Sequence, residues 1–278
     1  MLLRQRLLRA KKHLIATLAV CTAVIMLAAC TAGTAGSGGQ PGGDTGGNGG
    51  DSAGDPSKFL NFFPCCSWNT TWSYNPYNVN ALGIQNDYVT LRLAIQKSPS
   101  LTEFVPQLAD KWEIVDGKLN VHLREDAKWQ DDTPLTSKDL HDTVILNGLR
   151  GDGFWNDITD VEIVDEHTVA FTLKEGQPES LALLDILNGI RPYPSSIYGK
   201  FVTDELKQDV IKYFTTLQQD PEKATKLAEF KRMSDTFKDL AGMKVEKLIG
   251  NGPFQLENIT TKEAKLVKWD GFWDADKI

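Results

Sequence analysis

The sequence predicts a fold of mixed α-helices and β-strands, organised around one stretch that runs from Pro106 to Leu140. Two observations in that stretch predict it: a strand-like alternation before residue 124 and a helix-start signal after residue 134. A third is a hairpin pattern between Asp160 and Leu173. The chain has 278 residues and 41% hydrophobic content, which is enough to bury a substantial core.

The strand prediction rests on residues 118–123, where apolar and polar side chains alternate as they do in a strand with one buried face. Asp116-Gly117, just before this strand, is a turn signal. A second strand edge is expected at Ala127–Trp129, and Pro134 favours a turn after it. The alternating apolar residues are Leu119, Val121 and Leu123.

A helix is expected to begin at Thr136, because Thr136 and Asp139 have the spacing of a capping box. Leu135 and Leu140 hold the two positions of a hydrophobic staple around it. The helix is predicted to extend over Asp139–Leu149, and the residues on its inward face are Leu140, Val144 and Leu149.

His141 and Asp142 in this helix invite a metal or acid–base interpretation. We instead expect them on a solvated face, because no other histidine lies at ligand spacing.

The remaining predicted elements are a first strand in Lys58–Phe63, a hairpin over Asp160–Leu173 with its turn at Asp165-Glu166-His167, a helix over Pro221–Leu240, and a last hairpin of Gln255–Asn258 with Ala264–Trp269.

The composition narrows the classes of partner. The formal net charge is −7, and loss of the five basic residues in the first thirteen positions would bring it to −12. Such an acidic chain is not expected to bind nucleic acid, whose phosphates need a basic surface. It also has no basic stripe for anionic lipid.

The first thirty residues are typical of a targeting segment. A basic region reaches His13, an apolar run of fourteen residues spans Leu14–Leu27, and Leu27-Ala28-Ala29-Cys30 matches a lipobox. We expect residues 1–29 to be a lipoprotein signal peptide and Cys30 to be lipidated. The alternative is a permanent membrane helix, but the run is short of the roughly 20 residues that span a bilayer. Residues 30–56 then read as a Gly/Ser-rich tether.

Several motifs follow one another along the chain: Pro106-x-Leu108-Ala109-x-x-Trp112-Glu113, Leu123-Arg124 followed by Trp129-x-Asp131-x-x-Pro134-Leu135-Thr136-x-x-Asp139-Leu140, Val161-x-Ile163-Val164-Asp165-x-x-Thr168-Val169-x-Phe171-Thr172-Leu173, Gly252-Pro253-Phe254 and Phe272-Trp273. In this order they resemble one known family, the family 5 extracellular solute-binding proteins, which include the oligopeptide-, dipeptide- and nickel-binding receptors of ABC importers. One departure is local, because Asp131-Asp132 stands where the family usually has Asp-Gly, and the turn is expected to differ there.

The resemblance implies a type II periplasmic-binding-protein-like fold. Residues 57–278 would form the N-terminal part of the solute-binding domain: a β-rich small domain plus part of the first lobe, with the second lobe absent. Members of the family capture a ligand between two lobes that close by hinge motion. With one wall only, this chain is expected to bind peptides weakly or not at all.

A segment rich in aromatic and amide side chains follows the first predicted strand, and the resemblance places it toward the ligand cleft. Aromatic faces and amides suit the wall of a pocket, although aromatic residues also cap core edges. We expect ligand contacts from Trp68, Asn69, Trp72 and Tyr74. Near the crossing between the lobes, Asn251 and Gly252 are candidates for the hinge side of the cleft, or simply a turn.

Cys65 and Cys66 are interpreted as unpaired or buried thiols rather than a metal or redox site.

The predicted function is binding without catalysis. The chain would be the lipid-anchored, extracytoplasmic substrate-binding component of an ABC importer at the cell membrane, with oligopeptides as the favoured ligand, no cofactor and no metal. Its partners would be a peptide or other small solute, the transporter permease subunits and the membrane. A secreted hydrolase and a surface sensor or adhesion module are the alternatives. The hydrolase lacks the usual signatures, because H-E-x-x-H does not occur and the one G-x-S-x-G match, Gly50–Gly54, lies in the predicted tether.

Overall fold

The computed structural model describes residues 59–62, 72–83, 87–100, 102–261 and 263–278, with the backbone alone described in 59–62. These residues all belong to one compact unit, Ala53–Ile278. The predicted signal peptide and the whole predicted tether lie outside the described residues, as do Cys30, Cys65, Cys66, Trp68 and Asn69.

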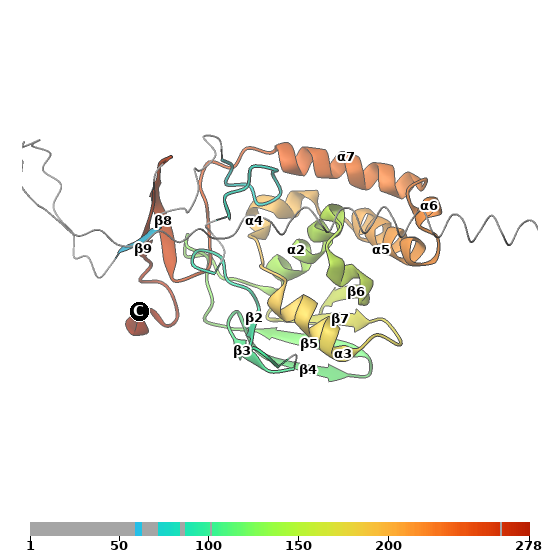
Figure 1. Ribbon diagram of the computed structural model, residues 1–278, viewed down its shortest axis with the longest axis horizontal. Coiled ribbons are helices and arrows are strands. Elements are labelled where there is room, and N and C mark those ends of the chain that lie inside the picture. The colour runs from blue at the N-terminus through green and yellow to red at the C-terminus, as the bar shows by residue number, and fades with distance from the viewer. Residues whose placement is uncertain (1–58, 63–71, 84–86, 101, 262) are drawn as a thin grey trace, which may run out of the picture. The chain divides into compact units, whose positions relative to one another are not determined.

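The predicted strands and hairpin at the centre of the chain are confirmed as a four-stranded antiparallel sheet. Its order is β4-β5-β7-β6 (Figure 1). Alternation in β5 puts Leu119, Val121 and Leu123 in the core. The Asp116-Gly117 turn has φ values of 51° and 75°, the left-handed conformation that a two-residue hairpin loop needs. The strands are β4 (Ala109–Val115), β5 (Lys118–Leu123), β6 (Ile158–Ile163) and β7 (Thr168–Leu173).

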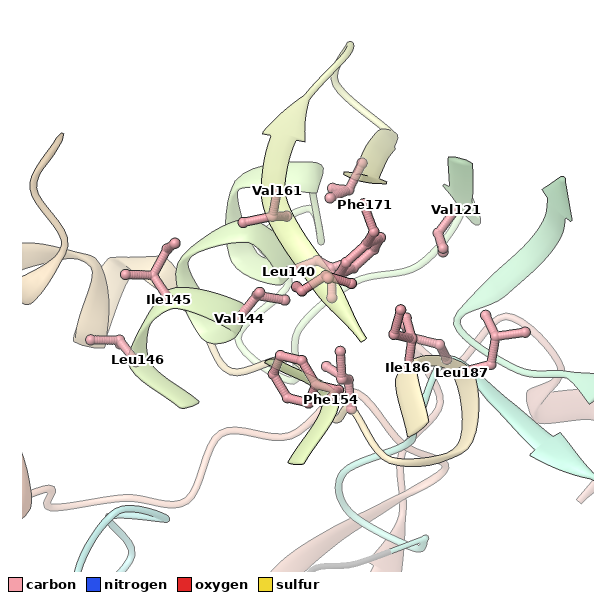
Figure 2. Packing of buried hydrophobic residues seen from close by; sticks show 14 of the residues in the cluster. Val121, Leu140, Val144, Ile145, Leu146, Phe154, Val161, Phe171, Ile186 and Leu187 are labelled. Carbon is pink, nitrogen blue, oxygen red and sulfur yellow. The ribbon is translucent and has the colours of Figure 1, made fainter. Parts of the chain in front are cut away.

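Helix α2 (Ser137–Arg150) confirms the predicted helix and its start. The Asp139 carboxylate accepts a hydrogen bond from the Thr136 backbone N–H at 2.8 Å, and the staple residues Leu135 and Leu140 are both fully buried. One side of α2 faces the sheet: Figure 2 shows Leu140 and Val144 pointing toward Val161 and Phe171. The helix therefore covers the apolar face of the sheet.

Helix α2 is buried on its other side as well. Ile145 and Leu146 lie away from the sheet (Figure 2) and are fully buried, because α5 and α7 pack against α2 there. The helices are α3 (Glu179–Leu183), α4 (Ser195–Tyr198), α5 (Asp204–Gln219), α6 (Pro221–Ala224) and α7 (Ala228–Gly242), with a π-helix at Leu184–Asn188 and 3₁₀ turns at Gly153–Asn156, Gly199–Phe201 and Ala275–Lys277. None in the described part of the chain is long and apolar enough to span a bilayer.

The single helix predicted over Pro221–Leu240 is wrong. The chain forms α6, leaves helical geometry at Leu227, where ψ is 143°, and begins α7 at Ala228. The physical reason is tertiary: α7 packs back along α5, and Arg232 of α7 forms an ion pair with the buried Asp209 of α5. A straight helix that started at Pro221 could not turn back to pack along α5 and bring Arg232 to Asp209.

Two smaller sheets complete the described fold. The first predicted strand and the last predicted hairpin are confirmed, and they combine in a three-stranded antiparallel sheet of order β1-β9-β8. Its strands are β1 (Phe59–Phe62), β8 (Phe254–Ile259) and β9 (Ala264–Lys268). The other sheet pairs β2 (Ala94–Gln96) with β3 (Phe104–Pro106). Segments from the two ends of the described chain thus meet in one sheet.

The strand edge predicted at Ala127–Trp129 is also wrong, because only one isolated bridge forms there, between Lys128 and Pro134. The turn between Lys128 and Pro134 is too tight for further strand pairing. Asp132 has φ of 69°, a left-handed conformation that glycine adopts more readily. The expected difference from the family's turn stays a prediction.

Replacing Asp132 by glycine is expected to stabilise the protein by about 1 kcal/mol, because an L-residue in the left-handed region is strained and glycine is not. The turn should otherwise survive, since Asp131, not Asp132, accepts from the Thr133 N–H and hydroxyl. Urea denaturation measures the change. Asp131→Gly is the control and should destabilise. An unchanged midpoint for D132G would contradict the strain argument.

The expectation of a solvated face at His141 and Asp142 is wrong. The Asp142 side chain is only 3% exposed, because α4 packs over it. Its carboxylate accepts hydrogen bonds from Lys138 Nζ at 2.7 Å and Ser195 Oγ at 2.8 Å, and lies 3.2 Å from His141 Nδ1. Burial alone would raise the pKa of Asp142, but the hydrogen bonds from His141, Lys138 and Ser195 outweigh it and lower the pKa below its usual range.

This lowered pKa predicts an acid-sensitive contribution to stability. A carboxyl whose pKa is lower in the folded than in the unfolded state stabilises the fold above its unfolded pKa of about 3.9, and the contribution is lost as pH falls through the folded pKa. Asp142→Asn should therefore cost most near pH 7 and progressively less below pH ~4. Urea denaturation at pH 3 and pH 7 tests this, with the exposed Asp239→Asn as control. A cost that does not change with pH would refute it.

Candidate functional site

One hollow brings together two of the predicted ligand-binding residues. It has a volume of about 320 Å³, and we call it the Trp72 hollow. Its floor is formed by the apolar side chains of Trp72, Tyr74 and Leu256, which pack on the small cluster of Leu82, Ile259 and Ala264, whereas most of the exposed lining is polar. The lining residues are Trp72, Tyr74, Glu246, Lys247, Leu248, Leu256, Glu257, Asn258 and Ile259.

The aromatic wall is held by the backbone of Ser73. Its N–H donates to Asn80 O at 2.9 Å, and its carbonyl accepts from Leu82 N at 3.0 Å, in a short parallel bridge with residue 81. Because side chains alternate along an extended segment, Trp72 and Tyr74 project to the same side. The predicted pairing of these two aromatics in one pocket wall thus has a local backbone cause.

The same segment is tied to the end of α7. The buried Asn75 side chain donates from Nδ2 to Leu240 O at 2.6 Å and to Met243 O at 3.1 Å. Leu240 lies in the last turn of α7, where carbonyls lack the regular helical partner four residues on, and Met243 is the residue that caps the helix. Residues 246–248, which follow α7, are thereby kept beside the aromatic wall.

Charged side chains form the rim of the hollow. Glu246 pairs with Lys244 at 2.7 Å, and Glu257 pairs with Lys265 at 2.6 Å. Lys247 has no ion-pair partner among the described residues. An apolar, aromatic floor with a polar rim suits a ligand that carries both apolar groups and hydrogen-bonding groups.

Asn251 does not line this hollow. It is 0% exposed, and its Oδ1 accepts the Leu91 N–H at 2.8 Å, while its Nδ2 has no partner in the described part of the chain. Its backbone N–H and that of Gly252 both donate to Val89 O at 2.9 Å. Asn251 therefore belongs to a hydrogen-bonded contact between residues 88–91 and 250–254, which we call the joint. Its predicted contact with a ligand stays a prediction.

The joint contains a residue that sequence reasoning missed. Gln130 is buried, and its carboxamide binds the segment Gly250–Phe254 at three points. No local signal marks it, because its partners lie 120 to 124 residues away in the chain. We call this arrangement the Gln130 clasp.

A second hollow, of about 750 Å³, is strongly polar. It lies where β5 ends and β7 begins, and five of its lining residues are carboxylates. Two are engaged: Asp126 pairs with Arg124, and Asp165 accepts the His167 N–H at 2.9 Å, the main reason why its pKa is lowered. Within the described residues, His, Cys, Asp and Glu form no group of three that could hold a metal ion. The lining carboxylates are Asp110, Glu125, Asp126, Asp165 and Glu166.

The fold defines the class of protein. It aligns with a periplasmic oligopeptide-binding protein of Thermotoga maritima, solved with mannohexaose bound, at a TM-score of 0.51 and 22% identity, over 76% of this chain and 33% of that one. A second structure of the same protein gives the same TM-score at 23% identity. The fold is thus part of the type II periplasmic-binding-protein fold.

The sequence comparisons agree. The Salmonella typhimurium periplasmic oligopeptide-binding protein OppA is 32% identical over 120 residues, covering 34% of this chain and 22% of that protein. The Rhizobium meliloti periplasmic alpha-galactoside-binding protein is 34% identical over 107 residues, covering 34% and 15%. The model of the bacterial extracellular solute-binding proteins, family 5 Middle, matches residues 103–278. The chain belongs to this family, and it spans about a fifth of the length of the curated relatives.

Proposed function

We propose that the chain is the ligand-binding component of an ABC importer, with oligopeptides as the favoured ligand. Membership in family 5, with a match over residues 103–278, carries this proposal. The curated relatives include proteins named for oligopeptide binding, and the relatives found are transport proteins rather than enzymes. Because the chain covers only 22% of such a relative, binding by the whole receptor and delivery to permease subunits are part of the proposal.

The proposed ligand site is the Trp72 hollow together with Trp68 and Asn69. Trp72 and Tyr74 would hold apolar parts of the ligand on their ring faces, and the polar rim would meet backbone or charged groups. Asn251 would act from the joint behind this wall. No covalent step is needed, since a receptor only binds and releases its solute.

The proposed location is the extracytoplasmic face of the cell membrane, reached by cleavage before Cys30 and lipidation of its thiol. Residues 30–56 would then be a flexible tether between anchor and receptor. Mass spectrometry of the mature N-terminus decides this proposal, because an acylated Cys30 supports it and an intact Met1 refutes it.

Trp72→Ala is expected to weaken peptide binding at least tenfold, since a buried aromatic contact is often worth about 2 kcal/mol or more. The chain can be labelled with 5-fluorotryptophan and titrated with mixed peptides up to millimolar concentration, with ¹⁹F NMR as the readout. We expect weak binding whose shifts include the Trp72 resonance. Trp273→Ala, which removes a tryptophan stacked on Arg124 away from the hollow, is the matched control. Peptide-induced shifts that persist in W72A would refute the site.

A further inference from the structure

The Trp72 hollow has two walls that are connected through the joint. One wall comes from residues 246–248, after α7, and the other from Leu256–Ile259 in β8. The chain passes from the first wall to the second through Gly250–Phe254, which is the segment held by the Gln130 clasp. The path of these five residues therefore sets how the two walls face each other.

The clasp uses every hydrogen-bonding atom of the Gln130 carboxamide. Oε1 accepts the Gly250 N–H at 3.1 Å, and Nε2 donates to Gly252 O at 3.1 Å and Phe254 O at 2.7 Å. The Gln130 backbone N–H adds a bond to Gly250 O at 2.8 Å. Two carbonyls facing one amide nitrogen fix the orientation of the side chain, because a flipped amide would set oxygen against oxygen.

The segment is also held by the turn residues Tyr88 and Val89. Val89 O accepts from Asn251 N and Gly252 N, and Tyr88 O accepts from Phe254 N at 3.1 Å. The approach is so close that a Cβ on Gly252 would lie 2.4 Å from Tyr88 O. Two sets of hydrogen bonds thus hold Gly250–Phe254 in place. Gln130 makes one set, and Tyr88 and Val89 make the other.

We propose that Gln130 is a positioning residue for the Trp72 hollow: its carboxamide sets the relation between the wall at residues 246–248 and the wall in β8. Gln130 does not line the hollow and does not touch the ligand. The role in ligand binding rests on the proposed function, whereas the role in shaping the hollow rests only on the contacts above.

The test uses the full chain labelled with 5-fluorotryptophan, in which Trp72→Phe assigns the Trp72 signal among the seven tryptophans. Gln130→Met keeps the side-chain length and removes all three bonds. We expect the ¹⁹F resonance of Trp72 to move by more than its linewidth. Gln96→Met is the matched control, because it removes one glutamine bond, to Ser100 O, outside the hollow. A Trp72 resonance that is unmoved in folded Q130M would overturn the proposal.

Gln130→Glu gives a second, pH-dependent readout that a loss of packing would not produce. At pH 9 the ionised carboxylate would still accept from Gly250 N but would repel Gly252 O and Phe254 O. Burial raises the pKa of such a carboxyl, so at pH 5 it is expected to be protonated and to donate again to one carbonyl. The Trp72 resonance of Q130E should therefore return toward the wild-type position at pH 5. A shift that does not depend on pH would overturn the proposal, even if Q130M does not fold.

A peptide titration separates this inference from the proposed function. If wild type binds peptide, Q130M should bind about tenfold more weakly, the equivalent of one or two net hydrogen bonds. If wild type binds none, which agrees with the expectation of weak or no binding by this chain, the Trp72 resonance of the two variants still decides whether Gln130 shapes the hollow.

Discussion

Gly250→Ala is expected to lower the free energy of unfolding by about 3 kcal/mol, because there is no room for a methyl group in the joint. A Cβ at this position would lie 1.9 Å from Val89 O and 2.6 Å from Val89 Cγ1. The carbonyl cannot move away without breaking its bonds to Asn251 N and Gly252 N. Urea denaturation monitored by tryptophan fluorescence measures the loss.

Gly153→Ala is the matched control, because an added Cβ at Gly153 meets nothing within 4 Å and its φ is not positive. Its effect should stay within about 1 kcal/mol, the usual difference in backbone freedom between glycine and alanine. Equal stability of G250A and wild type would show that residues 88–91 and 250–254 are not packed as described.

Trp155→Ala should have the largest effect in the main core, about 3 to 5 kcal/mol. The ring is fully buried and stacks on Phe214 at 5.6 Å between centroids, and its Nε1 donates to Val144 O at 3.0 Å. Removing it leaves a cavity between α2 and α5 and removes one hydrogen bond to a carbonyl of α2. Thermal and urea unfolding should both report the loss.

Two variants distinguish the sources of this effect. Trp155→Phe keeps most of the packing but loses the hydrogen bond, so it should cost about 1 to 2 kcal/mol. Phe230→Ala removes an aromatic ring that stacks on Tyr213 but is 37% exposed, and it should cost less than W155A. If F230A and W155A were equally destabilising, α2 and α5 would not enclose Trp155 as described.

Elements with complete local signals were predictable. The alternation in β5, the Asp116-Gly117 turn and the capping box at Thr136 each depend on residues within four positions of one another. Such signals act on the backbone directly, through side-chain period, allowed φ and satisfied end groups. These parts of the fold therefore followed from sequence.

Elements set by distant partners were not predictable. Asp142 has the sequence context of a surface residue, yet α4 arrives from more than 50 residues away and buries it against Ser195. The spacing over Pro221–Leu240 is helical throughout, yet the packing of α7 on α5 breaks the helix at Leu227. Local periodicity records which side chains are apolar, and it cannot show which surface will cover them.

In the candidate site, too, some features could be predicted from the sequence and others could not. By itself the sequence determined the class of binding protein and placed Trp72 and Tyr74 in one wall, because motifs and aromatic spacing are local properties of the chain. Only the tertiary structure brought residues 246–248 and β8 around those rings and revealed Gln130 behind them. A hydrogen bond between residues more than 100 positions apart depends on where the folded backbone passes, and no short stretch of sequence encodes that path.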